Sequence, residues 1–397
     1  AGGTALIGGD YKGEGTVPNA KTTFISQDST IKADAEVAGN GGKVIAWADK
    51  TPVFQGKISA RGGKTSGDGG FVEVSGKENL GFDGFVDAGA DFGKAGELLL
   101  DPATVIIGLD DDNDIQLNDQ EILSTDPGAT FRISASTVVG ALINGDVTIE
   151  ATDNIDVKAP IFLVADNKSD LTLNAPSINI DADESIFIGG DLNLFATNIE
   201  GGRSSRISST NGNIKLESEL GDLTIIGTRI LSPSGNIEVR SPGKVNISEI
   251  GDENTGTPVI LKAKGNISIT GDQEIEIKAF ENLDSILLSG GDLNLVSDGD
   301  IIGNARISSV GNFSAGNGNA SEFNQALSLN GIISSNGDVS FDNYTGSSLK
   351  VEAKGSILVT GDINITGVGK FPQTGDPDIA ILNAGPSLIL RAGVENL

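Results

Sequence analysis

The 397-residue sequence has no histidine, no cysteine and no methionine. Without histidine and cysteine it cannot form Ser-His or Cys-His nucleophile pairs, disulfides, thiolate metal sites or the ordinary zinc sites. No apolar run approaches the roughly 18 residues that a membrane-spanning helix needs, so we expect no membrane insertion. Because nothing at Ala1 resembles a signal peptide either, we expect the chain to begin downstream of its own start.

Basic and aromatic residues are scarce as well. There are 27 lysines and arginines against 55 aspartates and glutamates, which gives a formal net charge of −28, and aromatic residues make up only 5%. Such a polyanion repels nucleic-acid backbones and anionic membrane surfaces, so we expect no nucleic-acid partner and cations as the counter-charge. The 55 glycines are typical of many tight corners and thin layers rather than of a thick aromatic core.

Short strands between glycine turns are the main pattern that is present. Between residues 41 and 102, runs of alternating apolar and polar residues end at Gly-Gly pairs, and none has the 3.6-residue period of a helix. From Gly145 onward the units have the form Gly-(Asn/Asp/Ser/Lys)-apolar-x-apolar, as at residues 212–216, 235–239 and 265–269. Each unit predicts a strand with one apolar face that begins at a glycine turn.

A longer repeat overlies these units. Residues 263–272 return as residues 353–362, and the sequence of residues 206–209 returns at residues 306–309. Repetition of this kind is typical of a solenoid, in which each coil buries its apolar face against its neighbours. The sequence therefore predicts an all-β fold, a parallel β-helix, with an array of β-sandwiches as the alternative.

Polar residues recur at the predicted corners and on the predicted strands. We expect the acidic turn residues to stabilise their own turns by bonding to the local backbone. We expect the recurring asparagines to stack as internal amide ladders. The acidic turn residues are Asp191, Asp222, Asp292 and Asp362, and the asparagines are Asn193, Asn213, Asn236, Asn266 and Asn294.

The first quarter of the chain also resembles a known family. The segments GGKVIAWADKTPVFQGKISARGG, GGFVEVSGKENLGFDGFVD and GELLLDP, preceded by AGGTALIGGDYKGEGTVPNA, resemble filamentous-haemagglutinin-like exoproteins of two-partner secretion systems. The resemblance covers residues 1–102, and beyond about residue 160 it is one of repeat style only. It implies a right-handed parallel β-helix in a large secreted protein, at or released from a bacterial surface, with an outer-membrane secretion partner.

Three regions follow from these observations. Residues 1–102 form the haemagglutinin-type β-helix segment, residues 103–144 a boundary or insertion, and residues 145–397 a repeat β-helix shaft. The boundary contains an acidic loop and a possible short helix over residues 134–143 with Ser136 as its N-cap, or else another strand and turn.

The acidic loop is the candidate metal site. Its oxygen-bearing residues fall at positions 1, 3, 5, 7, 9 and 12 of a calcium-loop pattern, although position 6 is Ile115 instead of glycine and no flanking helix pair is predicted. The alternative is a solvated acidic loop with no ion. The candidate calcium ligands are Asp110, Asp112, Asp114, Gln116, Asn118 and Glu121.

These observations favour a secreted, non-enzymatic cell-surface protein that acts in adhesion or in building extracellular fibres. Its partner would be a surface glycan or protein, or copies of itself stacked end to end through residues 1–5 and 387–391. A polysaccharide-active β-helix enzyme is a remoter alternative, because the acids recur singly at turns instead of converging. Trp47, the only tryptophan, is expected to pack rather than to stack on a sugar.

Overall fold

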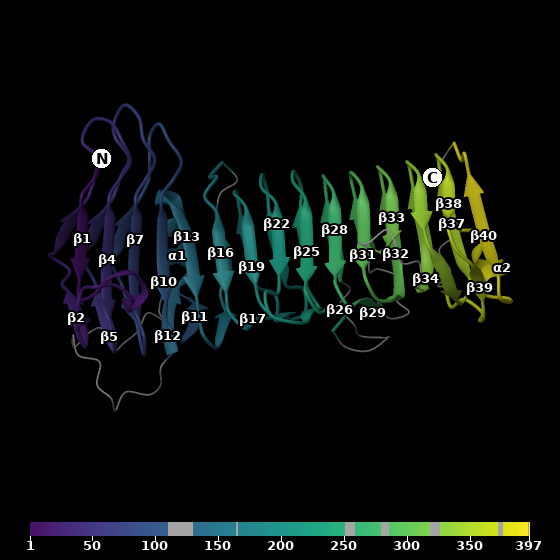
Figure 1. Ribbon diagram of the computed structural model, residues 1–397, viewed down its shortest axis with the longest axis horizontal. Helices are drawn as coiled ribbons and strands as arrows, with labels where there is room; N and C mark the ends of the chain where they lie inside the picture. Colours follow the sequence, from purple (N-terminus) through teal and green to yellow (C-terminus); the bar gives the residue numbers. More distant parts are fainter. Residues whose placement is uncertain are drawn as a thin grey trace. The chain divides into compact units, whose positions relative to one another are not determined.

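The computed structural model describes residues 1–109, 130–163, 166–250, 259–278, 286–317, 326–371, 376–395 and 397. They belong to two compact units, Ala1–Leu194 and Phe195–Leu397. Each unit is a stack of coils whose strands pair in parallel with those of the next coil (Figure 1). The predicted all-β parallel β-helix is thereby confirmed, and the β-sandwich alternative is wrong.

Most coils contribute three strands, each to its own ladder. In the second unit β22 (Ile214–Glu217), β23 (Leu223–Ile226) and β24 (Arg229–Ser232) make one coil. They pair in parallel with β25 (Ile237–Ser241) and with the two strands that follow it. Successive coils differ in length, and the corner residues that bond to each other in the second unit are 18 to 30 positions apart.

The first ladder begins every coil. In the first unit its strands are β1 (Thr4–Ile7), β4 (Lys43–Ala48), β7 (Phe71–Gly76), β10 (Glu97–Asp101), β13 (Asp146–Glu150), β16 (Leu171–Asn174) and β19 (Leu192–Phe195). In the second unit they are β22, β25, β28 (Ile267–Gly271), β31 (Leu293–Ser297), β33 (Phe313–Gly316), β35 (Val339–Phe341) and β38 (Ile357–Val359).

The other sheets complete the coils, and two of them, at the start of the first unit, have only three strands each. In the first unit their strands are β2 (Thr22–Ile25), β3 (Thr30–Lys32), β5 (Thr51–Phe54), β6 (Lys57–Ser59), β8 (Gly81–Phe82), β9 (Phe85–Asp87), β11 (Thr104–Gly108), β12 (Thr130–Ser134), β14 (Asn154–Val157), β15 (Ile161–Phe162), β17 (Ser177–Ile180) and β18 (Ser185–Ile188). In the second unit they are β20 (Asn198–Gly201), β21 (Arg206–Ser209), β23, β24, β26 (Lys244–Ser248), β27 (Ile260–Ala263), β29 (Glu274–Lys278), β30 (Ile286–Ser289), β32 (Ile301–Ser309), β34 (Ala326–Ser335), β36 (Asn343–Gly346), β37 (Leu349–Ala353), β39 (Ile363–Ile365) and β40 (Leu388–Ala392).

The core lies inside the coils and is aliphatic. Along a strand every second side chain points inward, so Ile237 and Val239 of β25 are 1% and 0% exposed while their neighbours Glu238 and Arg240 are exposed. The strands predicted over residues 212–216, 235–239 and 265–269 are all present. The glycine-bounded apolar alternation therefore predicted both the strands and the faces that they bury.

A ladder of side-chain oxygens joins the corners of successive coils. In the second unit, Oδ1 of Asn213 accepts from the amide of Asn236, and Oδ1 of Asn236 accepts from the amide of Asn266. The amides of Asp292 and Asn312 continue the series by donating to the side chains of Asn266 and Asp292. Asp292, and at another corner Asp222, which accepts from the amide of Lys244, thus bond to the next coil. The prediction of bonds to the local backbone is wrong for these two acids.

The asparagine prediction is right in part. Asn213, Asn236 and Asn266 do form a ladder, but they are exposed at the corners, so the ladder is not internal. Asn193 and Asn294 lie on strands instead, where Asn193 donates to the hydroxyl of Thr172 at 3.4 Å. The position within the repeat decides between the two. An asparagine directly before the first inward-facing residue of a strand lies at the corner, whereas an asparagine between two inward-facing residues lies on the outer face of the strand.

Buried serine hydroxyls form hydrogen bonds with the backbone of the same corners. Ser289 and Ser335 are both 0% exposed. The Ser289 hydroxyl donates to the carbonyl of Gly265 in the preceding coil and accepts from the amide of Gly291 in its own turn. Because each serine satisfies backbone groups in two coils, the corners keep few orphaned polar atoms.

Helix α1 (Ala135–Asn144) confirms the short helix in the boundary region. Its N-cap is Ser134, whose hydroxyl oxygen accepts from the amide of Thr137, so the prediction of Ser136 as N-cap is wrong. Strand β12 ends at Ser134, so this is the last residue with extended backbone. The other helices among the described residues are the 3-10 turn η1 (Tyr11–Gly13) and α2 (Ile379–Leu382).

Candidate functional site

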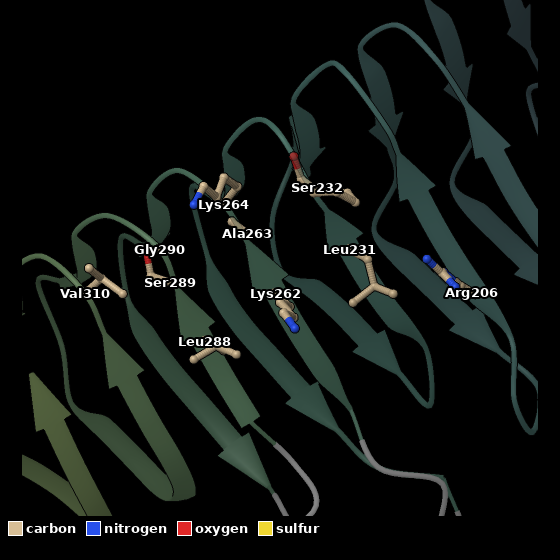
Figure 2. A pocket seen from close by; sticks show the side chains of 11 residues that line it. Arg206, Leu231, Ser232, Lys262, Ala263, Lys264, Leu288, Ser289, Gly290 and Val310 are labelled. Atoms are coloured by element: carbon tan, nitrogen blue, oxygen red, sulfur yellow. The ribbon is translucent and has the colours of Figure 1, made fainter. Parts of the chain in front are cut away.

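A groove on the outer face of β21, β24, β27 and β30 is a candidate site in the second unit (Figure 2). Its volume is about 450 Å³. Its apolar lining comes from Leu231, Pro233, Leu288 and Val310. Its ionisable lining residues are all basic, namely Arg206, Lys262 and Lys264.

Strand register brings the lining of this groove together. Leu231, Lys262 and Leu288 are direct partners in the ladder of β24, β27 and β30. Their neighbours Ile230 and Leu261 are both 0% exposed and fill the core, so these three side chains point outward. Figure 2 shows them side by side, with Arg206 beyond Leu231 and Val310 beyond Leu288.

The basic side chains of the groove have no partners in the described part of the chain. None of Arg206, Lys262 and Lys264 forms an ion pair with a described carboxylate. The Nε of Arg206 is also buried and makes no hydrogen bond there. Within a chain whose net charge is −28, the groove is a local concentration of positive charge that no described carboxylate pairs.

A second candidate is a buried carboxyl group in the first unit. Glu73 of β7 is 0% exposed. Its Oε1 accepts from the backbone amide of Lys12 at 3.0 Å, while its Oε2 is buried with no hydrogen-bond partner in the described residues. Burial raises the pKa of Glu73 to about 7, against the opposing effect of the Lys12 hydrogen bond.

Other charged groups lie around Glu73. Burial, together with the nearby charge of Glu150, raises the pKa of Asp101 to about 6. The ammonium of Lys12 lies 2.5 Å from Oε2 of Glu150 and makes the ion pair of this cluster. A carboxyl with a pKa near 7 has the strength of a general acid, but Glu73 lies beneath the Lys12 backbone and is closed to solvent, so it cannot meet a polymeric substrate.

A third candidate is an ion-pair cluster around Lys350. The Lys350 ammonium lies 2.7 Å from Oδ2 of Asp376, 2.8 Å from Oδ2 of Asp378 and 3.1 Å from Oε2 of Glu352. Arg391 of β40 also binds Asp378, and hydrogen bonds from Arg391 and Lys350 lower the pKa of that carboxyl. All these charges are paired, so the cluster ties the α2 segment to β37 and β40.

Trp47 packs, as the sequence predicted, and it lies on strand β4. It is 6% exposed, and its Nε1 donates to Oδ1 of Asp49 at 3.3 Å. Gly13, at φ 69°, lies so close that a Cβ there would come within 2.5 Å of the indole ring. The ring is thus covered and is not available to stack on a sugar.

The predicted calcium ligands Asp110, Asp112, Asp114, Gln116, Asn118 and Glu121 lie outside the described residues. Among the residues that are described, no group of three or more acidic side chains could hold a metal ion.

Sequence reasoning missed the groove and Glu73. The signal for the groove was a set of basic residues, Arg206, Lys262 and Lys264, in a chain dominated by acids. Its members are spread over many residues, so only the register of the coils reveals that they share a face. For Glu73 the signal was an acid inside the otherwise apolar run of β7.

No protein-family model matches this chain, and no curated protein is similar to it. In the described ranges, no helix is long and apolar enough to cross a membrane. The resemblance of residues 1–102 to filamentous-haemagglutinin-like exoproteins therefore stays a prediction, and the functional argument depends on the geometry.

Proposed function

We propose that this chain is part of a secreted, non-enzymatic cell-surface protein that acts in adhesion or in building extracellular fibres. The observation that carries the proposal is the stack of repeated coils, whose outward strand faces and corners offer a long surface for contact. Support also comes from the candidate sites: Glu73 is closed to solvent and the Lys350 cluster is internally paired, so neither resembles an open reactive centre.

The proposed setting follows from the resemblance and from the charge. Export by an outer-membrane secretion partner and display at the cell surface are what residues 1–102 imply. With a net charge of −28, contact with nucleic acid is unfavourable, and the proposed partners are a surface glycan, a surface protein or copies of the chain itself.

The first test locates the protein and its adhesion. Antibodies against the chain should label intact producing cells, and external protease should remove the label. Beads coated with the purified chain should bind cells above albumin-coated beads, and treatment of the cells with glycosidase or protease identifies the partner. Labelling only after lysis overturns the surface location, binding equal to albumin overturns adhesion, and release of sugars from acidic polysaccharides overturns the non-enzymatic assignment.

A second candidate function, a structural polymer, is favoured by the last described coil. Leu358 of β38 is 57% exposed, and Leu388 and Leu390 of β40 are 38% and 39% exposed. These strands are the last of their ladders among the described residues, and a further coil, from the same polypeptide or from a second copy, would pair with their outer edges. A second copy could supply that coil and extend the stack into a fibre.

Negative-stain electron microscopy of the purified chain, with calcium and with a chelator, separates the two candidates. Fibres with a regular axial repeat support the polymer, and loss of the fibres in chelator supports the predicted calcium site. Separate particles under both conditions contradict the polymer and leave adhesion as the function.

A further inference from the structure

No described residue covers the apolar lining of the groove in the second unit, where Leu231 and Leu288 are half-buried. Leu231 and Leu288 flank the aliphatic stem of Lys262 in one outward row, and Val310 is 56% exposed at the corner. Exposed apolar surface is unfavourable in water, and contiguous apolar patches on soluble proteins commonly mark binding sites. The groove therefore favours a ligand with an apolar body.

The corners shape one wall of this groove. Pro233, Lys264, Gly290 and Val310 each follow the inward residue that ends a strand, and those inward residues are partners in the ladder. Gly290 has no side chain, and a Cβ there would meet the Lys264 carbonyl oxygen at 2.2 Å. The wall is therefore open at the Gly290 coil, between the side chains of Lys264 and Val310.

The charge of the groove defines the other end of the ligand. Its three ionisable residues are all cationic and unpaired among the described residues, and Nε of Arg206 is buried without an acceptor. A buried donor with no acceptor is costly, and a carboxylate satisfies a guanidinium with two charge-assisted hydrogen bonds. Charge complementarity thus calls for an anionic group near Arg206 or the lysines.

Size and lining distinguish the classes of anionic ligand. A volume of about 450 Å³ is that of a small-molecule site. From β21 to β30 the groove spans three ladder steps, on the order of 14 Å, so an extended chain fits along it. A sugar polymer usually meets aromatic faces, and the groove has none, whereas its leucines, proline and valine match a hydrocarbon chain.

We propose that this groove binds a single-chain anionic amphiphile, a long-chain carboxylate. Its tail lies along Leu231, Lys262 and Leu288, and its carboxylate pairs with the basic side chains that line the groove. This site is independent of where the protein works, and its failure would leave the proposed adhesive function in place.

The test is isothermal titration calorimetry of the whole chain with dodecanoate, below the concentration at which it forms micelles. We expect saturable binding of one dodecanoate per chain. Dodecanol, which has the tail without the charge, and acetate, which has the charge without the tail, should each bind on the order of tenfold more weakly or not at all.

Two substitutions and a matched control place the site. Lys264→Glu and Leu288→Asp should each weaken dodecanoate binding on the order of tenfold. Lys264→Glu replaces a positive charge by a negative one, and Leu288→Asp places a negative charge in the apolar lining. Lys354→Glu is the control, because Lys354 follows Ala353 at the equivalent corner of the later repeat, outside the groove. All three positions are on the outer surface, and the thermal melting of each variant shows that it has folded.

Three results would overturn the proposal. Dodecanol that binds as tightly as dodecanoate removes the role of the cations. If heparin or polyglutamate binds as tightly as dodecanoate, and Leu288→Asp does not change that binding, the groove is a site for polyanions. Absence of saturable dodecanoate binding, or equal loss in the Lys354→Glu control, rules out an amphiphile site at this groove.

Discussion

The first ladder is buried differently in its earliest coils and in the coils of the second unit. In β4 and β7 nearly every residue is buried, on both faces of the strand. In β25 and β28 buried and less buried residues alternate. The same ladder position is therefore a two-sided interior in one region and a one-sided surface in the other.

The cause is a covering segment in the first unit, which includes η1. The ring of Tyr11 meets Phe71 edge-on at 5.8 Å, the amide of Lys12 binds Glu73, and Gly13 packs against Trp47. In the second unit the outward residues remain at the surface, where Lys215 and Arg240 pair with Glu217. A covering segment of a few residues thus buries positions that lie at the surface in the second unit, and one of the buried side chains is the carboxyl group of Glu73.

The largest expected difference between the regions is at Trp47. We expect Trp47→Ala to lower the free energy of unfolding by about 3–5 kcal/mol, because it leaves a cavity between β4 and its cover. Glu238→Ala, at an outward position of β25, should stay within about 0.5 kcal/mol of the parent. Denaturant unfolding measures both, and equal losses would contradict the two-sided burial of β4.

The next effect is the pH dependence of Glu73. Its pKa rises from 4.5 unfolded to about 7 folded, so the folded chain binds more protons, and stability falls as the pH rises between those values. Glu73→Gln keeps an acceptor for Lys12 and removes the ionisation. We expect the free energy of unfolding of Glu73→Gln to exceed that of the parent by roughly 2–3 kcal/mol at pH 8. Below pH 4.5 this pH-dependent difference should be absent.

Denaturant melts of Glu73→Gln and its parent across this pH range measure the effect. Glu238→Gln, the same substitution on an uncovered strand, is the matched control for the loss of a carboxyl group. A constant offset of Glu73→Gln from the parent at every pH would mean that Glu73 does not titrate near 7.

The corner ladder offers a smaller comparison. At the corner where the second unit places mostly asparagine, the first unit has Asp146, whose Oδ1 accepts from the amide of Asp170. Burial and the charge of Asp170 raise the pKa of Asp146 to about 6, so its ionisation near neutral pH costs stability. Asp146→Asn should stabilise the chain by about 1–2 kcal/mol at pH 8 and lose that advantage below pH 4, as melts at the two pH values would reveal.

The smallest expected effect is at the exposed ladder of the second unit. Asn266→Ala removes the acceptor for the amide of Asp292 and should cost about 1 kcal/mol of unfolding free energy. Asn266→Asp keeps the acceptor oxygen and should cost less. Equal losses in both variants, measured by denaturant melts, would show that the ladder bond does not contribute.

Local patterns in the sequence were enough for the strands and the inward faces, and they gave the helix as one of two alternatives. Gly235, Asn236 and Ile237 mark a corner and the first inward residue, because side-chain alternation and glycine turns act over a few residues. The helix over residues 135–144 could be predicted too, but choosing between Ser134 and Ser136 as cap required knowing where β12 ends.

The contacts between coils came only from the tertiary structure. Leu231, Lys262 and Leu288 share a row because coils of unequal length keep one register, and no local pattern states those lengths. The corner oxygens likewise bond to the next coil, 18 to 30 residues away. Glu73 is buried because a distant segment covers it. Alternation and turns are local properties, whereas register and cover depend on which segments meet after folding.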